Sequence, residues 1–154
     1  MRIALKIFTL CVALVIAGCS TDRATKEAIR RAETIAREMP DSALVLIESV
    51  DPQNVRGEDD KAHYRLVEAE VLYYNRILPD REEVAQPLFD HYLTSNDHRE
   101  RARAMYQYAL VMQAEGENAE ALYALLEAEK SLELCKYLDK PRLQGLVHRT
   151  KGEI

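Results

Sequence analysis

Apolar residues recur at intervals of three and four along most of the chain, and this helical pattern is clearest between residues 102 and 128. The apolar positions of this stretch form two stripes: Met105, Tyr108, Ala109 and Met112, then Ala121, Leu125 and Ala128. Gly116 lies between the stripes, and glycine readily adopts the left-handed conformation that ends many helices. The pattern therefore predicts two antiparallel helices joined by a tight turn, with alanines where the two backbones approach closely.

Residues 24–50 are predicted to form an earlier helical pair. Apolar residues at helical spacing continue up to Met39, where Pro40 disfavours helix because its ring restricts the backbone of the preceding residue. Asp41 or Ser42 then has the side chain that caps a helix N-terminus, and a second apolar stripe follows. We therefore expect two short helices that meet at Pro40.

A second pair begins with a long helix predicted over 58–78. Asp80, with Glu83 three residues later, is typical of a capping box, so the partner helix should begin there. Pro87 lies inside that partner helix, where it removes one hydrogen bond and should kink the helix at a cost of about 3 kcal/mol.

The same capping signals frame the last part of the chain. Asp97 and Glu100 predict the start of the hairpin described first, whose second helix should run to about Tyr137. Asp139 and Pro141 predict one more helix, because proline is favoured in a first helical turn.

We expect this last helix to leave an incompletely covered apolar edge. The residues concerned are Leu143, Leu146, Val147 and Ile154. Arrays of helical pairs need a cap, since one unit cannot cover its own apolar face. Truncation of a longer array, pairing with a second copy or a partner, and fraying of the helix each account for such an edge.

The first nineteen residues predict a targeting segment. Arg2 and Lys6 precede a mostly apolar run over 7–18, which as helix is about 18 Å long, too short for a hydrocarbon core of about 30 Å. The run ends in small residues before Cys19 and resembles a bacterial lipobox, in which cleavage before this cysteine follows attachment of diacylglycerol to its thiol. A buried apolar helix with an incidental cysteine is the alternative.

Charge and cysteine content narrow the class of partner. The chain has 21 Lys and Arg and 26 Asp and Glu, and residues 1–18 hold two of the basic residues and no acidic one, so the mature chain carries a formal charge of −7. This balance argues against a nucleic-acid partner and a polybasic membrane contact, which leaves Cys19 as the anchor. Cys135 then lacks an intramolecular partner and fits a small buried hydrophobe, with a redox or intermolecular thiol as the alternative.

The sequence contains no motif that predicts catalysis. Zincin, nucleophile-elbow, P-loop and dinucleotide-binding patterns are absent, and no Cys/His spacing suggests zinc. The four histidines are expected at the surface. We therefore predict no catalytic residue, no metal site and no cofactor.

The hairpin at 102–128 resembles a tetratricopeptide repeat. In that pattern the small residue of the first helix falls at Ala109, the turn glycine at Gly116, and the small-large-small trio of the second helix at Ala121, Leu125 and Ala128. The resemblance implies an all-α fold, a right-handed α-α superhelix of about three and a half hairpins over 24–154. An N-terminal signal helix (1–18) and a lipidated tether (19–23) would precede it. Two departures are Met105, where an aromatic residue is common, and Glu68 in place of the small residue one repeat earlier.

The resemblance places the partner-binding surface on the concave face lined by the first helix of each pair. The candidates on this face are Arg65, Tyr73, Arg103, Tyr106 and Gln113. Arginine and tyrosine around an apolar centre are typical of interface hot spots. Alternatively, both tyrosines pack between neighbouring repeats, and both arginines pair with acids such as Glu68 or Glu100.

The chain is similar to envelope proteins common in Bacteroidetes. We predict a lipid-anchored helical-repeat scaffold that binds a protein or peptide partner at the bacterial cell envelope without catalysis. Ser20 after Cys19, where aspartate would favour retention, suggests the outer membrane. One alternative is a sensory fragment of a larger envelope signalling or transcription-regulatory protein, and another is an envelope enzyme with an unrecognised site. Self-association through the last helix is a further expected contact.

Overall fold

The computed structural model describes residues 20–136 and 139–154, and these ranges contain helices and no strand. The α-helices of these ranges are α2 (Arg23–Ile35), α3 (Pro40–Glu48), α4 (Glu58–Tyr74), α5 (Gln86–Tyr92), α6 (His98–Glu115), α7 (Asn118–Leu134) and α8 (Lys140–Glu153). A short 3₁₀ turn, η1 (Pro52–Asn54), and a π-helical turn, η2 (Arg81–Ala85), complete them. The expected signal segment and Cys19 lie outside the described residues. Within them, no helix has both the length and the hydropathy needed to cross a bilayer.

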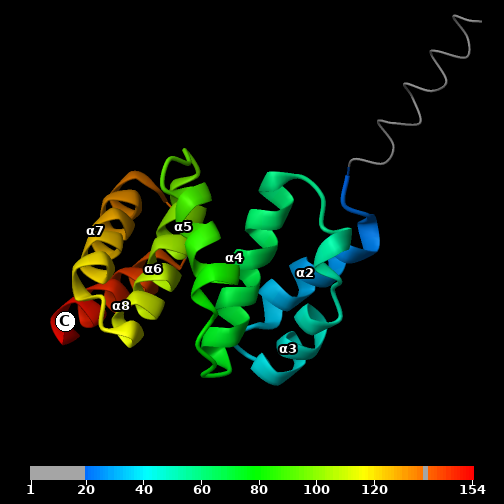
Figure 1. The fold of residues 1–154 in the computed structure, drawn as a ribbon, viewed down its shortest axis with the longest axis horizontal. Helices are drawn as coiled ribbons and strands as arrows, with labels where there is room; N and C mark the ends of the chain where they lie inside the picture. Colours follow the sequence, from blue (N-terminus) through cyan, green and yellow to red (C-terminus); the bar gives the residue numbers. More distant parts are fainter. Residues whose placement is uncertain (1–19, 137–138) are drawn as a thin grey trace, which may run out of the picture.

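Successive helices pack against each other in pairs, α2 with α3, α4 with η2 and α5, and α6 with α7 (Figure 1). Each pair also contacts the next, because α2 packs on α4, α4 on α6, and α6 on α8. The all-α prediction is therefore confirmed, and alternate helices are brought side by side although the chain between them is long.

The hairpin of α6 and α7 forms as predicted. Gly116 has a left-handed backbone with φ 82° and ψ 9°. Its N–H donates to the Gln113 carbonyl, at 3.1 Å, and the N–H of Glu117 donates to the Met112 carbonyl, at 2.8 Å. Every residue of the two predicted stripes is buried. These bonds satisfy carbonyls at the end of α6 and turn the chain directly into α7.

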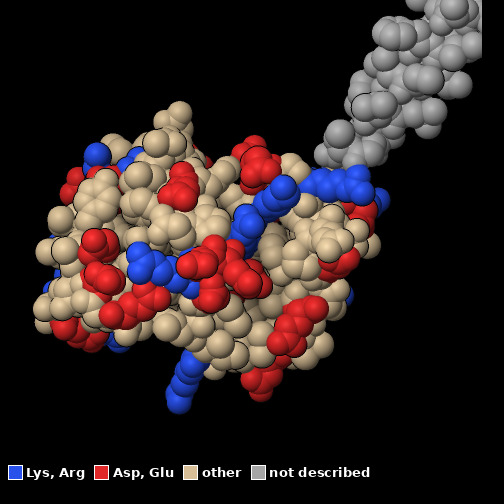
Figure 2. Space-filling model, in the orientation of Figure 1, with Lys and Arg blue, Asp and Glu red and all other residues tan. Residues whose placement is uncertain are grey.

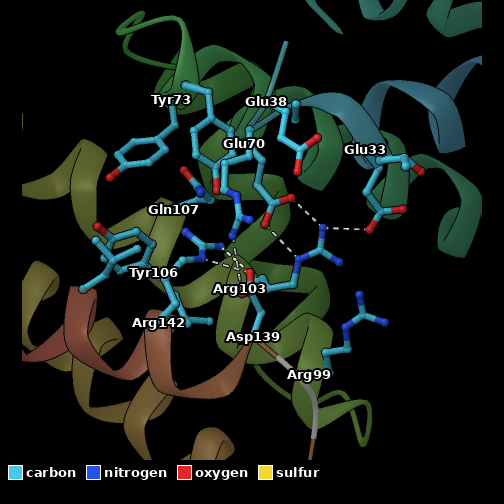
Figure 3. Close-up of a pocket in the computed structure, with 16 residues that line it drawn as sticks. Glu33, Glu38, Glu70, Tyr73, Arg99, Arg103, Tyr106, Gln107, Asp139 and Arg142 are labelled. Carbon is cyan, nitrogen blue, oxygen red and sulfur yellow. Dashed lines mark hydrogen bonds and ion pairs between the residues drawn. The ribbon is translucent and has the colours of Figure 1, made fainter. Parts of the chain in front are cut away.

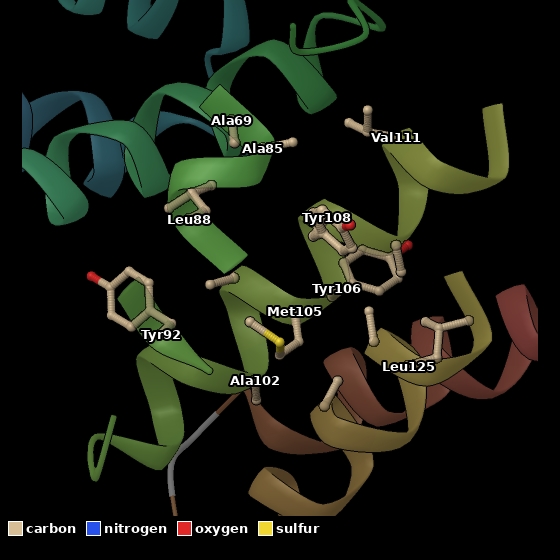
Figure 4. Packing of buried hydrophobic residues seen from close by; sticks show 14 of the residues in the cluster. Ala69, Ala85, Leu88, Tyr92, Ala102, Met105, Tyr106, Tyr108, Val111 and Leu125 are labelled. Atoms are coloured by element: carbon tan, nitrogen blue, oxygen red, sulfur yellow. The ribbon is translucent and has the colours of Figure 1, made fainter. Parts of the chain in front are cut away.

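The core consists of two apolar clusters on opposite sides of α4. Tyr64, Val67 and Val71 face the first cluster, with α2 and α3. The other side of α4 presents Leu66 and Ala69 to a larger cluster that includes residues of α5, α6, α7 and α8 (Figure 4). Because α4 contributes to both clusters, it joins the first helical pair to the rest of the molecule.

Two of the predicted helix caps are present. Oδ1 of Asp80 accepts a hydrogen bond from the Glu83 N–H at 2.8 Å. Oδ1 of Asp97 accepts from the N–H groups of Arg99 and Glu100, both at 3.1 Å. Short acidic side chains therefore fix the starts of η2 and α6 as the sequence suggested.

The predicted boundary around Pro40 was wrong in detail. The first helix ends at Ile35 rather than Met39, and Pro40 is the first residue of α3. Asp41 lies inside the first turn instead of capping it, and the N-cap position is Met39. Proline fits this place because the first helical residue has no intrahelical partner for an N–H.

The helix predicted over 58–78 ends at Tyr74. Arg76 adopts φ 61°, and its N–H donates to the Tyr73 carbonyl at 3.0 Å, while the N–H of Ile77 donates to the Leu72 carbonyl at 2.9 Å. The left-handed residue stops α4 by the geometry that glycine usually supplies. No glycine marked this position, so the sequence did not reveal the stop.

Pro87 interrupts its helix as expected, through a wide turn. The N–H of Ala85 donates to the carbonyl of Asp80, five residues back, at 3.0 Å in η2. Proline has no N–H to offer the Glu83 carbonyl, and Nε of Arg65 donates to that carbonyl at 3.2 Å. A side chain from α4 thus satisfies a group that the proline cannot.

The expected apolar edge at α8 is wrong for two of its residues. Leu143 and Val147 are buried, Leu146 is half-buried against the larger cluster, and Ile154 is exposed. Residues 143, 147 and 150 share one helix face and point toward the neighbouring helices, because α8 packs on both α6 and α7. Polar positions such as His148 face outward.

The second helix of the hairpin ends at Leu134, before the predicted Tyr137. Cys135 follows it as a free, half-buried thiol packed against the larger cluster. Its position fits a small, partly buried hydrophobe at a helix end.

Candidate functional site

Alternate helices line an open pocket of about 290 Å³ (Figure 3). The charged residues that line it are Glu33, Arg37, Glu38, Glu70, Arg99, Arg103, Asp139 and Arg142. The uncharged residues are Thr34, Ala36, Tyr73, Tyr74, Tyr106, Gln107, Leu143 and Leu146. They come from α2, α4, α6 and α8 or from the residues directly beside these helices, so the pocket depends on the stacking of all four.

Arg103 forms the centre of an ionic cluster beside the pocket. Its Nε and Nη2 donate to the two carboxylate oxygens of Glu70 on α4, at 2.8 and 2.5 Å. Nη1 donates to Oε1 of Glu100 at 2.7 Å, and Nη2 lies 2.8 Å from Oε1 of Glu33 on α2. Arg103, a residue only 8% exposed, thus joins α2, α4 and α6 through one guanidinium. Burial lowers the pKa of Arg103, but the three carboxylates outweigh it, so the pKa is raised.

His63 adds a second cation to this cluster. Its Nδ1 lies 3.3 Å from Oε2 of Glu100, and its Nε2 lies 3.5 Å from Oε2 of Glu33. Hydrogen bonds to Glu100 and then Glu33 raise the pKa of His63 to about 9. The hydrogen bond from His63 lowers the pKa of Glu33 to about 2, against the cost of burial and with help from Arg103. At neutral pH both groups are therefore charged, and the expectation of an ordinary surface histidine was wrong here.

A more exposed ion triad lies at the mouth of the pocket. Asp139 accepts from Nη2 of Arg142 at 2.8 Å, and Nη1 of Arg37 lies 3.6 Å from its other oxygen. The hydrogen bond from Arg142 holds the pKa of Asp139 below its usual value. These contacts connect the end of α2 to the start of α8, and their exposure to water limits what they add to stability.

Two tyrosines and a glutamine, Tyr73, Tyr106 and Gln107, line another part of the pocket. The rings of Tyr73 and Tyr106 meet edge to face with centroids 6.1 Å apart. Burial raises the pKa of Tyr106, so its hydroxyl stays neutral. Gln107 is 5% exposed, and its buried Oε1 has no hydrogen-bond partner among the described residues. Figure 3 places these three side chains together on the left of the view.

Three of the five residues predicted for the binding face line the pocket: Tyr73, Arg103 and Tyr106. Both tyrosines also pack between α4 and α6, and Arg103 also pairs with Glu100, as the alternative interpretations held. Nε of Arg65 instead donates to the Glu83 carbonyl, and Arg65 does not line the pocket. Gln113 lies in the last turn of α6, also outside the pocket lining.

Sequence reasoning missed most of the remaining ionic partners. Glu33, His63 and Glu70 lie on two helices that precede Arg103 by at least 33 positions. No local spacing relates them to the arginine. The only signal within one helix was Glu100 with Arg103, at a spacing of three.

The visible surface carries acidic and basic side chains interspersed rather than segregated (Figure 2). Among the described residues, no group of three or more His, Cys, Asp or Glu side chains is placed to hold a metal ion. A shallower, mostly apolar hollow lies between Phe89, Tyr108 and Tyr123, away from the charged pocket.

Comparison with protein-family models, with curated proteins and with solved structures finds no match for this chain.

Proposed function

We propose that the protein is a lipid-anchored helical-repeat module that binds a protein or peptide partner at the bacterial cell envelope and performs no chemistry. The observation that carries the proposal is the pocket on the side of the stack where α2, α4, α6 and α8 meet, lined by arginines and tyrosines. Such residues are enriched among those that contribute most to the binding energy of protein interfaces. The contacting face is thus assembled from alternate helices, as in repeat proteins that bind along one surface.

We further propose that the helices form a tetratricopeptide-like right-handed superhelix. Support comes from the buried stripes of the α6–α7 hairpin, its glycine turn, and the contacts of each first helix with the next. Repeats longer than the usual 34 residues fit the lengths of α4, α6 and α7.

The proposed anchor is diacylglycerol on Cys19, with the outer membrane as the destination. The charged start, short apolar run and small residues before this cysteine support it. Replacing Cys19 by alanine should abolish labelling with a radioactive fatty acid and release the protein from membranes. Unchanged membrane retention, with no labelling of the unaltered protein, would reject the anchor.

Partner binding is tested by affinity capture from native membranes followed by mass spectrometry. Tyr73→Ala should reduce the recovered partner by at least about tenfold, because Tyr73 is half-buried on the pocket wall. Gln113→Ala is the matched control, since Gln113 is also half-buried but lies outside the pocket. Equal recovery with both variants would place the binding surface elsewhere. Arg103 and Tyr106 are unsuitable for this test, because both are buried and their removal perturbs folding.

A sensory module of a larger signalling protein is the second candidate. The volume of the pocket, about 290 Å³, favours it, because small-molecule sites are clefts that begin at about this size. An in-frame continuation of the gene into a membrane helix and a DNA-binding domain would support this candidate.

A further inference from the structure

The outer face of α7 is apolar although it points away from the rest of the molecule. Its exposed large apolar residues are Leu122, Tyr123, Leu126 and Leu134, with exposed fractions of 38%, 48%, 48% and 62%. The opposite face, which includes Ala121, Leu125 and Ala128, is buried against the other helices. Figure 1 shows α7 at the end of the stack farthest from α2 and α3. A contiguous apolar surface of this kind indicates that another protein covers it.

An aromatic hollow lies beside the first half of this face. It has a volume of about 250 Å³ and is lined by Phe89 on α5, Tyr108 on α6, and Ala119, Glu120 and Tyr123 on α7. Leu134 lies 14 residues after Glu120, which is almost four helical turns, so both project from the same flank of α7. This flank therefore has an apolar hollow at one end and a protruding apolar side chain at the other.

Charged side chains differ between the two halves of the same flank. Glu120 is exposed in the first turn of α7, and Lys130 is exposed in its second half. Nζ of Lys130 lies 3.7 Å from Oε1 of Glu127, near the limit of an ion pair, and Glu127 already pairs with Arg101 on α6. The ammonium group of Lys130 thus remains able to pair with a carboxylate of another molecule.

An antiparallel copy of the same helix matches the hollow to the protruding leucine. Leu126 lies at the middle of α7, so a twofold axis beside it overlaps the two helices along their whole length. At about 1.5 Å of rise per residue, Leu134 and Ala119 lie about 12 and 11 Å from this axis, in opposite directions. Leu134 of one copy therefore meets the aromatic hollow of the other, and Leu126 packs against its own counterpart.

The charges match in the same register. Lys130 of one copy comes opposite Leu122 of the other, where its long side chain reaches Glu120 and the ring of Tyr123. Glu133 comes near the N-terminus of the other α7, where the helix dipole favours an anion. Parallel helices in register would instead place each of these charges beside its own like. Charge complementarity thus favours the antiparallel pair.

We propose that two copies of the chain associate through antiparallel α7 helices, with Leu134 of each copy in the aromatic hollow of the other. One pair of 17-residue helices makes a smaller contact than the standard interface of about 800 Å² per partner, so the dimer should be weak. The charged pocket stays open in this dimer, because no residue of α7 lines it. This inference goes beyond the proposed partner binding and differs from self-association through α8.

Cysteine cross-linking of the full chain in membranes tests the proposal. In a Cys135→Ala background, Leu126→Cys should form a disulfide-linked dimer on mild oxidation, because the twofold axis brings this residue beside its counterpart. Val45→Cys is the matched control, since Val45 is 67% exposed on α3, which does not pack on α7. The background chain without an added cysteine measures any cross-linking through Cys11 or Cys19.

Mixed cysteine pairs and charge reversal test the register. Copies with Leu134→Cys should cross-link to differently tagged copies with Ala119→Cys, but not to one another. Either Lys130→Glu or Glu120→Lys should lower the dimer yield of Leu126→Cys at least about threefold, since each change acts twice in a symmetric dimer. Combining the two charge changes should restore the yield.

Far-ultraviolet circular dichroism shows whether each variant is folded, and the residues changed on α7 are all exposed. The proposal would be overturned if Leu126→Cys cross-linked no more than Val45→Cys, if Leu134→Cys linked equally well to itself, or if the double charge reversal did not restore the yield. Adducts of Leu126→Cys with a different protein would also overturn it, because they assign the face to another partner. Tyr73→Ala changes the pocket and not α7, so failure here is distinguishable from failure of partner binding.

Discussion

Replacing Arg103 by methionine removes the cation shared by three glutamates on three helices. The methionine keeps an unbranched apolar stem of similar shape, so the change tests charge more than packing. The remaining carboxylates have side chains only 14–24% exposed, and they lose a partner at 2.5–2.8 Å. We therefore expect a clear loss of stability.

The magnitude follows from the burial of the cluster. Removing one member of a buried ion pair costs about 3–5 kcal/mol, because the other charge remains buried. His63 remains as a second cation beside Glu33 and Glu100, which favours the lower end, about 3 kcal/mol. For a domain of this size, that loss lowers the melting temperature by about 6–12 °C.

Urea unfolding followed by far-ultraviolet circular dichroism measures this loss. Arg30→Met is the matched control, because Arg30 lies 2.6 Å from Glu27 but the two side chains are 65% and 51% exposed. We expect no measurable change for the control. Adding Glu70→Gln to Arg103→Met should recover part of the stability, since one buried negative charge is removed.

The reasoning would be refuted if Arg103→Met lost less than about 1 kcal/mol, or if it behaved like Arg30→Met. Either result would mean that water screens the cluster as it does a surface pair. The same would follow if the added Glu70→Gln lowered stability further.

Two further predictions concern pH and backbone conformation. The pKa of Glu33 is depressed from 4.5 to about 2, so its contribution is present above pH 4.5 and should disappear as the pH falls toward 2. The pKa of His63 is raised from 6.5 to about 9, so its contribution is complete below pH 6.5 and should disappear as the pH rises through 9. After screening by solvent, the contribution of His63 to the free energy of unfolding is about 1 kcal/mol, because the His63 side chain is more than a third exposed. Urea midpoints measured from pH 2 to 10 should show both declines, and His63→Leu should remove the alkaline one; an unchanged alkaline decline in that variant would contradict the assignment. Gly116→Ala should destabilise the protein by about 1 kcal/mol through its positive φ alone, since no atom lies within 4 Å of the added methyl. Gly145→Ala, equally open but within α8, should stabilise by about 0.5–1 kcal/mol, and the same sign for both glycines would contradict the backbone explanation.

Two of the predicted caps and the glycine turn formed as predicted because their physics is local. Asp80 and Asp97 bond to N–H groups two or three residues away, and Gly116 ends α6 through its own backbone. The predictions failed where a residue adopted an unexpected backbone. Arg76 stopped α4 without a glycine, and Pro40 opened α3 rather than closing the preceding turn.

The lining of the pocket depends on contacts that no short stretch of sequence encodes. Tyr73, Arg103 and Tyr106 were named from the repeat pattern and do line the pocket, whereas Arg65 and Gln113 do not. The pattern gives the face of a helix but not the tilt and rotation that bring one helix against the next.

The sequence by itself determined where the helices form, where Asp80 and Asp97 cap them and where Gly116 turns the chain. Each of these features depends on interactions between residues within about five positions of one another. The ion cluster around Arg103, the pocket and the burial of α8 arise from packing. They bring together side chains from residue 33 to residue 147, and the pKa values of Glu33 and His63 depend on distances set by that packing.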